Sequence, residues 1–308
     1  MSAQTIASTR ATESGTSPRS TSTTGSTRRG RSRRSVRRVL LSVLAIALAL
    51  IWVFPVYWMV STAFKPDDQI NSLNPTWVPL HPTIRHFRDA INTAYFWNVL
   101  ENTLIIVGAT VLVGMVLAFL AAVALAKYRF TGRKLFIVVI IGIQMLPGLG
   151  LIIPLYVLLA RYHQVDQLSG VIVTYLTAAL PFSVWTLRGF LIGIPKELEE
   201  AAMVDGSTRL GAFTRILLPL VAPGLVATSV FTFITSWNEF LFANLLLNNQ
   251  SKQTITVWLS HFLGSEIHGT DWGALMAAST LTAIPVVIFF LLVQRRVVFG
   301  LTAGAVKG

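Results

Sequence analysis

The sequence of residues 195–219 is PKELEEAAMVDGSTRLGAFTRILLP, a charged and helix-favouring segment within a mostly apolar chain. Acidic residues fill the first turn of the helix predicted here: Glu197, Glu199 and Glu200. The helix dipole stabilises anions at that position. Asp205 and Gly206 predict the end of the helix, because glycine readily takes the left-handed conformation that often follows a helix C-terminus. The segment therefore begins as a short helix that stops at a glycine turn.

A second short helix is predicted after this turn. Ser207 or Thr208 can cap it, because a hydroxyl there accepts a hydrogen bond from a free backbone N–H. Apolar residues then follow at helical spacing: Leu210, Phe213, Ile216 and Leu217. We expect Pro219 to close the helix. Residues 195–219 thus form a predicted helical hairpin, which by composition alone is equally well interpreted as an ordinary loop between two membrane spans.

The composition is that of a polytopic membrane protein. Of 308 residues, 53% are hydrophobic and only 12% are charged, and the mean hydropathy is +0.64. Soluble domains carry about 25% charged residues. The absence of cysteine excludes disulfides and thiolate metal sites. The net charge of +12 sits in a tail and in short loops beside apolar runs, which is typical of membrane proteins and argues against nucleic-acid binding.

Six apolar runs are close to the roughly 20 residues that cross a bilayer. They cover residues 39–63, 102–126, 135–160, 170–194, 220–247 and 273–294. All are predicted to be helices, because hydrocarbon offers no hydrogen-bond partner to an open strand edge. The predicted fold class is an all-α integral membrane protein, with residues 39–294 as the transmembrane domain.

Small residues and prolines predict the shape of individual spans. The second span carries small residues at four-residue spacing, which allow close contact with another helix: Gly114, Ala118 and Ala122. Pro147 and Pro154 predict a kink or break in the third span, and Pro181 predicts an interruption of the fourth.

Basic residues predict the orientation. Residues 1–38 are rich in Ser, Thr, Gly and Arg, and we expect a disordered tail that lies against anionic cytoplasmic lipid. With this tail inside the cell, twenty of the twenty-five Lys and Arg residues fall on the cytoplasmic side. Because positive charge accumulates on that side, both termini are predicted to be cytoplasmic, including the tail of residues 295–308. The predicted hairpin then also lies in the cytoplasm.

The fifth span carries a polar stripe. Its members are Thr228, Thr232, Thr235 and Glu239 on one helical face, with Ser236 and Asn238 beside them. Such a stripe is costly against lipid and is expected to face protein or water. Two interpretations remain open: hydrogen bonds between helices, or a hydrophilic wall along a solute pathway. Glu239 lies about 30 Å from Pro219 along a helix, so we place it near the outer interface and assign it no proton relay.

The hairpin resembles a known motif. Glu200-Ala201-Ala202, Gly206, Ile216 and Leu218-Pro219 match the EAA loop of binding-protein-dependent ABC importers at its fixed spacing. A longer form, found in carbohydrate importers, adds further positions: Asp205, Phe213, Leu220 and Pro223. The resemblance implies the six-helix permease fold of type I ABC importers. It also implies that the hairpin couples to a separate ATPase through Glu200, Ala201, Ala202, Asp205, Gly206, Phe213 and Pro219.

The C-terminal end resembles the tail of the second permease of maltose-type sugar importers. The residues that carry this likeness are Gly300, Leu301, Thr302, Gly304 and Lys307. The resemblance implies that the tail docks between the two ATPase subunits. The alternative is a frayed chain end, which is the usual state of a C-terminus.

The resemblance implies a permease subunit that moves a mono-, di- or oligosaccharide across the cytoplasmic membrane, and not an enzyme. The implied partners are a second permease, an ATPase homodimer and an extracytoplasmic sugar-binding protein. The sequence contains no GxxxxGK[ST] motif, so we expect ATP and Mg²⁺ to bind the ATPase and no cofactor to bind this chain. No metal site and no catalytic residue are predicted. The alternatives are a secondary transporter or channel, and an ABC importer of a non-sugar solute such as glycerol phosphate.

Overall fold

The computed structural model describes the backbone of residues 28–264 and 270–305, and the side chains of residues 38–264 and 270–294. The chain divides into two units, residues 1–54 and 55–308. The first unit contains most of helix α1 (Arg28–Ala63), whose side chains from Val39 to Phe54 are exposed. The predicted disorder up to residue 38 is wrong for residues 28–37, which are helical, because arginine is a good helix former and extends the apolar helix that follows. Residues 1–27 lie outside the described part.

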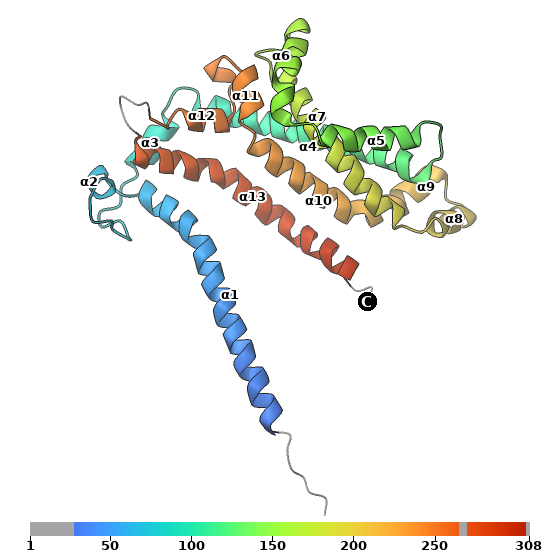
Figure 1. The fold of residues 1–308 in the computed structure, drawn as a ribbon, viewed down its shortest axis with the longest axis horizontal. Coiled ribbons are helices and arrows are strands. Elements are labelled where there is room, and N and C mark those ends of the chain that lie inside the picture. The colour runs from blue at the N-terminus through green and yellow to red at the C-terminus, as the bar shows by residue number, and fades with distance from the viewer. Residues whose placement is uncertain (1–27, 265–269, 306–308) are drawn as a thin grey trace, which may run out of the picture. The chain divides into compact units, whose positions relative to one another are not determined.

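Every regular element among residues 28–264 and 270–305 is a helix, as predicted (Figure 1). Within the described part of the chain, five helical segments are long and apolar enough to cross a membrane: 38–63 of α1, α4 (Phe96–Lys127), α7 (Leu168–Ile192), 209–237 ending in α10 (Leu218–Trp237), and 272–294 of α13 (Trp272–Ala305). The short helices are α2 (Asp67–Ile70), α3 (Arg85–Ile91), α8 (Glu197–Val204), α9 (Arg209–Ala212), α11 (Leu241–Leu246) and α12 (Ile255–Ser260).

The predicted third span is a bent pair of helices. Helix α5 (Arg133–Gln144) ends before Pro147, whose backbone is extended, and a short 3-10 turn leads into α6 (Ile152–Arg161). The two parts meet at 100°. The predicted break is therefore confirmed, and the described residues contain six candidate spans only if this pair counts as one. Pro147 has no N–H and cannot continue the helical hydrogen bonds, and Gly148 follows it directly.

Two predictions about individual spans are wrong. Helix α7 continues through Pro181 and is not interrupted there. The predicted span of residues 220–247 ends at Trp237, and α11 follows as a separate helix. The cause of this second break is Glu239, whose Oε1 and Oε2 accept hydrogen bonds from the N–H groups of Phe242 (2.8 Å) and Ala243 (3.1 Å). A carboxylate that caps free N–H groups favours a new helix start.

The centre of the second unit is the pair α4 and α7. The small residues Ala118 and Ala122 of α4 are fully buried, and a Cβ at Gly114 would lie 3.2 Å from the Leu176 side chain of α7. The predicted small-residue contact face of this span is thus confirmed. Helix α10 packs on both α4 and α7, and it joins them in a core that includes Leu187, Leu217 and other apolar residues.

The loops of the second unit gather at two ends of the helical body (Figure 1). At one end, Asn102 Nδ2 donates to the carbonyl of Ser251 (2.9 Å), and Trp258 Nε1 donates to Thr93 Oγ1 (3.1 Å). At the other end, α8 and α9 lie beside the end of α4. The loops that the prediction puts on one side of the membrane lie at the same end here, and which end faces the cytoplasm stays a prediction.

The turn between α6 and α7 is bonded to the segment after α11. The N–H of Asp166 donates to the carbonyl of Leu246 (2.7 Å), and Lys252 Nζ donates to the carbonyl of Asp166 (2.6 Å). The backbone N–H of Asn249, and then the Lys252 ammonium, hold the pKa of the Asp166 carboxyl below its usual value. These contacts fix the bent third span to the end of the body opposite to the hairpin of α8 and α9.

Replacing Gly170 by alanine tests this close turn. A Cβ at Gly170 would clash with the backbone oxygen of Gln164, so the turn must move. We expect a loss of about 3 kcal/mol in the free energy of unfolding, at the upper end of what overpacking costs. The measurement is thermal unfolding in detergent. Gly108→Ala is the control, because nothing lies within 4 Å of a Cβ there; equal midpoints for the two variants would contradict the described turn.

Candidate functional site

Helix α8 ends in a Schellman motif. The N–H of Gly206 donates to the carbonyl of Met203 (3.1 Å), and the N–H of Ser207 donates to that of Ala202 (2.9 Å). Gly206 has φ +86°, so the predicted left-handed glycine is confirmed. Nothing lies within 4 Å of a Cβ built on Gly206, so backbone conformation, and not space, requires glycine here.

The second helix begins at the predicted cap and ends elsewhere than predicted. Thr208 Oγ1 accepts a hydrogen bond from the N–H of Gly211 (3.1 Å) and caps α9. A π-helical turn, Phe213–Leu217, then leads directly into α10, so the prediction that Pro219 closes the helix is wrong. Proline is tolerated in the first turn of a helix, and a π turn before it relieves the clash with the preceding carbonyls. The hairpin is therefore continuous with a long apolar helix.

One face of the hairpin is buried against α4. Ala202, Ala212 and Leu217 are each less than a tenth exposed. The ring centroid of Phe213 lies 5.4 Å from that of Phe119 in α4. A cavity of about 630 Å³ remains between the hairpin and the end of α4. The hairpin is thus seated on the helical body and does not extend freely into solvent.

An ion pair joins the hairpin to α4. Lys127 Nζ, in the last turn of α4, lies 2.5 Å from Glu199 Oε1 in α8, and the two side chains are 11% and 26% exposed. Lys127 Nζ also donates to the carbonyl of Ile194 (3.5 Å). Sequence reasoning placed both residues on the same side of the membrane but did not pair them, because no motif or helical spacing links positions so far apart.

A second face of the hairpin is exposed and apolar, and two of its residues, Met203 and Leu210, also line the cavity beside α4. Four large side chains contribute to it: Leu198 (43% exposed), Met203 (40%), Val204 (87%) and Leu210 (71%). The predicted coupling residues Glu200, Ala201 and Asp205 are exposed beside them. The structure thus separates the predicted set, with Ala202 on the buried face and three others on the exposed face. An exposed apolar surface rimmed by charge is typical of a protein interface.

The half of the polar stripe that is nearer to the hairpin is hydrogen-bonded within the chain. Thr228 is 1% exposed, and its hydroxyl donates to the carbonyl of Gly224 (2.8 Å) and contacts Met115 Sδ in α4 (3.3 Å). Thr232 is fully buried, and its hydroxyl lies 3.4 Å from that of Ser183 in α7. For these residues the geometry favours the interpretation as contacts between helices.

The half of the stripe that is farther from the hairpin differs. Thr235 and Asn238 are exposed, and their side chains donate to backbone carbonyls of α10 itself. Ser236 is buried, and Glu239 serves as the cap of α11. The stripe is thus divided between buried hydroxyls and a small exposed polar group.

The predicted docking tail lies partly outside the described residues. The backbone of α13 is helical through Ala305, which includes Gly300, Leu301, Thr302 and Gly304. Lys307 lies outside the described residues. The role of this segment stays a prediction.

One cluster, at the end of the body opposite to the hairpin, was not singled out in the sequence. Potential ligand atoms of Asp67, His86 and Asp271 lie within 4.8 Å of one another. Each of these groups has another contact: His86 Nε2 lies 3.1 Å from the carbonyl of Lys65 and 3.4 Å from Asp67 Oδ1, and Asp271 Oδ1 accepts from the N–H of Ala274 (2.9 Å). These contacts indicate a structural role that joins α2, α3 and the start of α13.

Long apolar helices and a bent helix pair of sufficient hydropathy are the features of a multi-pass membrane protein. The chain belongs to the family described as binding-protein-dependent transport system inner membrane component, whose profile matches residues 111–302. This match includes the whole hairpin and the α10 stripe.

Two curated relatives match over nearly their whole length. The diacetylchitobiose uptake system permease protein DasC of Streptomyces coelicolor is 45% identical over 88% of this chain and 98% of its own. The trehalose/maltose transport system permease protein MalG of Thermococcus litoralis is 36% identical over 89% of this chain and 98% of its own. A solved bacterial ABC transporter involved in alginate import contains a chain with the same fold, at a TM-score of 0.72, 22% identity, and coverage of 89% of this chain and 99% of that one.

Proposed function

We propose that this chain is a transmembrane permease subunit of an ATP-driven importer that moves a sugar of one to a few rings across the cytoplasmic membrane. The observation that carries the proposal is the 45% identity, over almost the full length, to a permease of a diacetylchitobiose uptake system. The second relative, from a trehalose/maltose system, points to the same class of solute.

The hairpin of α8, α9 and the π turn is the proposed coupling element. Its buried face and the Lys127–Glu199 pair support a rigid attachment to the helical body. Its exposed apolar face, with Val204 and Leu210 most exposed, supports docking of a separate ATPase. In this proposal ATP and Mg²⁺ bind to an ATPase homodimer, and Gly300 to Lys307 reach that dimer from the end of α13.

The proposed translocation path is shared with a second permease. Thr235 and Asn238 supply polar groups on an exposed part of α10, where a second membrane subunit would complete a polar channel. Thr228 and Thr232 maintain the position of α10 against α4 and α7. The extracytoplasmic sugar-binding protein then docks at the end of the second unit opposite to the hairpin.

The orientation has a direct test. In this cysteine-free chain, Gln250→Cys and Arg129→Cys place single thiols at exposed positions on opposite ends of the body. In intact cells we expect a membrane-impermeant maleimide to label Gln250→Cys and not Arg129→Cys. Permeabilised cells provide the control for reactivity. Labelling of Arg129→Cys alone would reverse the proposed topology.

Deletion of the gene tests the proposed function. We expect uptake of at least one labelled sugar among diacetylchitobiose, trehalose and maltose to fall to background and to return with the intact gene. Uptake is expected to follow cellular ATP and to survive the collapse of the proton gradient when ATP is maintained. Normal uptake of a broad sugar panel, or uptake that follows the ion gradient alone, would overturn the proposal in favour of another solute or of secondary transport.

A further inference from the structure

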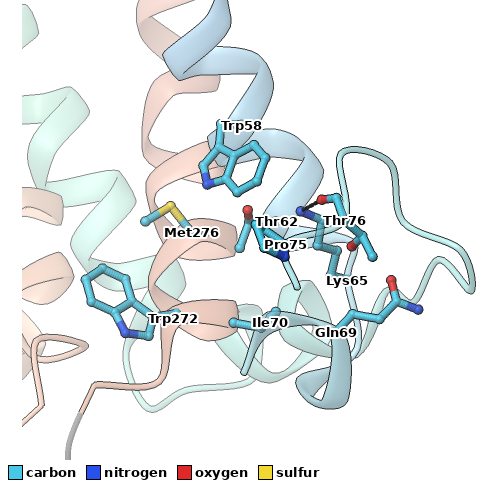
Figure 2. A pocket seen from close by; sticks show the side chains of 9 residues that line it. All are labelled: Trp58, Thr62, Lys65, Gln69, Ile70, Pro75, Thr76, Trp272 and Met276. Atoms are coloured by element: carbon cyan, nitrogen blue, oxygen red, sulfur yellow. Dashed lines mark hydrogen bonds between the residues drawn. The ribbon is translucent and has the colours of Figure 1, made fainter. Parts of the chain in front are cut away.

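Another cavity lies at the end of the body opposite to the hairpin. Its volume is about 300 Å³, and it lies among the last turns of α1, helix α2, the segment before α3 and the start of α13 (Figure 2). The lining residues belong to the second unit and are Trp58, Thr62, Lys65, Gln69, Ile70, Pro75, Thr76, Trp272 and Met276. This volume is at the lower end of the range of about 300–1,000 Å³ for small-molecule sites, which suits a ligand of one ring.

Two hydroxyls of the lining have no hydrogen-bond partner among the residues that the structure describes. Thr62 is only 7% exposed, and its Oγ1 is buried without a hydrogen bond. Thr76 Oγ1, from the facing loop, is also buried without one. A buried polar atom without a partner is destabilising, so a ligand that bonds to these hydroxyls would offset that cost. Figure 2 shows Thr62 between the α13 residues and the group formed by Lys65 and Thr76.

The other walls are aromatic and cationic. Trp272 is 52% exposed. Lys65 Nζ lies over the Trp58 ring, 4.1 Å from its centroid, in a cation–π contact. Lys65 is 2% exposed and donates to the carbonyl of Thr76 (2.6 Å), drawn as the dashed line in Figure 2. Burial lowers the pKa of the Lys65 ammonium, and a ligand hydroxyl would offer it a further acceptor.

These features together specify the chemistry of the occupant. The apolar face of a pyranose ring packs on an indole, and its hydroxyls can both donate to and accept from threonine hydroxyls. An anionic ligand fits less well, because three carboxylates adjoin the lining: Asp67 and Asp68 in α2, and Asp271 before Trp272. An acyl chain would leave both threonine hydroxyls without partners.

We propose that this cavity binds one neutral pyranose unit of a sugar before translocation. The proposal deepens the proposed sugar import and rests on it. The site would hold the sugar at the outer ends of α1 and α13. It is separate from the stripe on α10, so its loss is expected to weaken capture of sugar and to leave the translocation path intact.

The first test uses protection of a single thiol. In native membranes that contain full-length Thr62→Cys, methyl methanethiosulfonate modifies the thiol, and the unmodified fraction is counted with a mass-tagged maleimide. At about four times its Kd, diacetylchitobiose, trehalose or maltose is expected to slow the modification about fivefold. Ser72→Cys, exposed on the neighbouring loop and outside the lining, is expected to react at the same rate with and without sugar. Adding Trp272→Ala to Thr62→Cys is expected to abolish the protection.

The second measurement needs no reactive thiol. Saturation-transfer NMR of the same sugars on the cysteine-free full chain in nanodiscs is expected to give a signal that Thr62→Val and Trp272→Ala remove. Thr62→Val keeps the side-chain shape and removes a buried hydroxyl without a partner, so the variant is expected to fold at least as well. Stronger protection by glucuronate than by glucose, protection by alkyl chains alone, or no protection and no NMR signal would each overturn the proposal. If sugar is imported while these results are negative, the site fails and the proposed function stands; if no sugar is imported, the function itself fails.

Discussion

Gly206→Val is expected to abolish most ATP-coupled transport while the chain remains inserted in the membrane. Gly206 has φ +86°, a conformation that a β-branched residue adopts at a cost of about 1–3 kcal/mol. The cost falls on the Schellman motif that sets the angle between α8 and α9. The spans do not depend on this motif, so the amount of inserted chain is expected to stay near that of the wild type. The measurement is sugar uptake per inserted chain.

Gly206→Asn is the matched control. Asparagine tolerates positive φ several-fold better than most residues, and no neighbour lies within 4 Å of the added Cβ. We expect this variant to retain most of the transport. Normal transport by Gly206→Val, or equal losses by both variants, would show that the angle of the turn is not what coupling requires.

Breaking the Lys127–Glu199 pair is expected to have the second large effect. Lys127→Met leaves Glu199 partly buried beside α4 without its cation, and Glu199→Gln leaves the ammonium without its carboxylate. Because both groups are mostly shielded from water, each single change is expected to destabilise the attachment of the hairpin by about 2 kcal/mol. ATP hydrolysis would then proceed with little sugar uptake.

The double variant separates this pair from the rest of the site. Lys127→Met with Glu199→Gln removes both charges, so its loss is expected to be smaller than the sum of the two single losses. Additive losses in uptake would mean that the two residues act independently and that the ion pair does not anchor the hairpin.

The sequence predicted the elements whose cause is local. Gly206 predicted the turn because its conformation is a property of the residue, and Thr208 predicted the cap because its hydroxyl bonds three residues away. The contact face of Gly114, Ala118 and Ala122 was predictable because spacing alone places small residues together.

The errors concern prolines and helix ends, where tertiary contacts decide. Pro181 lies within an unbroken α7, and Pro219 follows a π turn that sequence rules do not anticipate. The end of α10 at Trp237 depends on Glu239 as the cap of α11.

Long-range partners were beyond the reach of sequence patterns. The Lys127–Glu199 pair and the cavity with Thr62 and Thr76 bring together residues that no motif connects. The burial of Thr228 and Thr232 depends on the packing of α4 and α7 against α10. The sequence of a polar stripe does not tell whether other helices or water lie against it.

Reconstituted import tests the central claim most directly. The tagged full chain, purified with its co-purifying subunits, is placed in proteoliposomes with the sugar-binding protein outside and ATP with Mg²⁺ inside. We expect labelled sugar to accumulate only when ATP is hydrolysed, and Gly206→Val to hydrolyse ATP with little accumulation. Sugar accumulation driven by an ion gradient without ATP would contradict the assignment of this chain to an ATP-driven importer that couples through its hairpin.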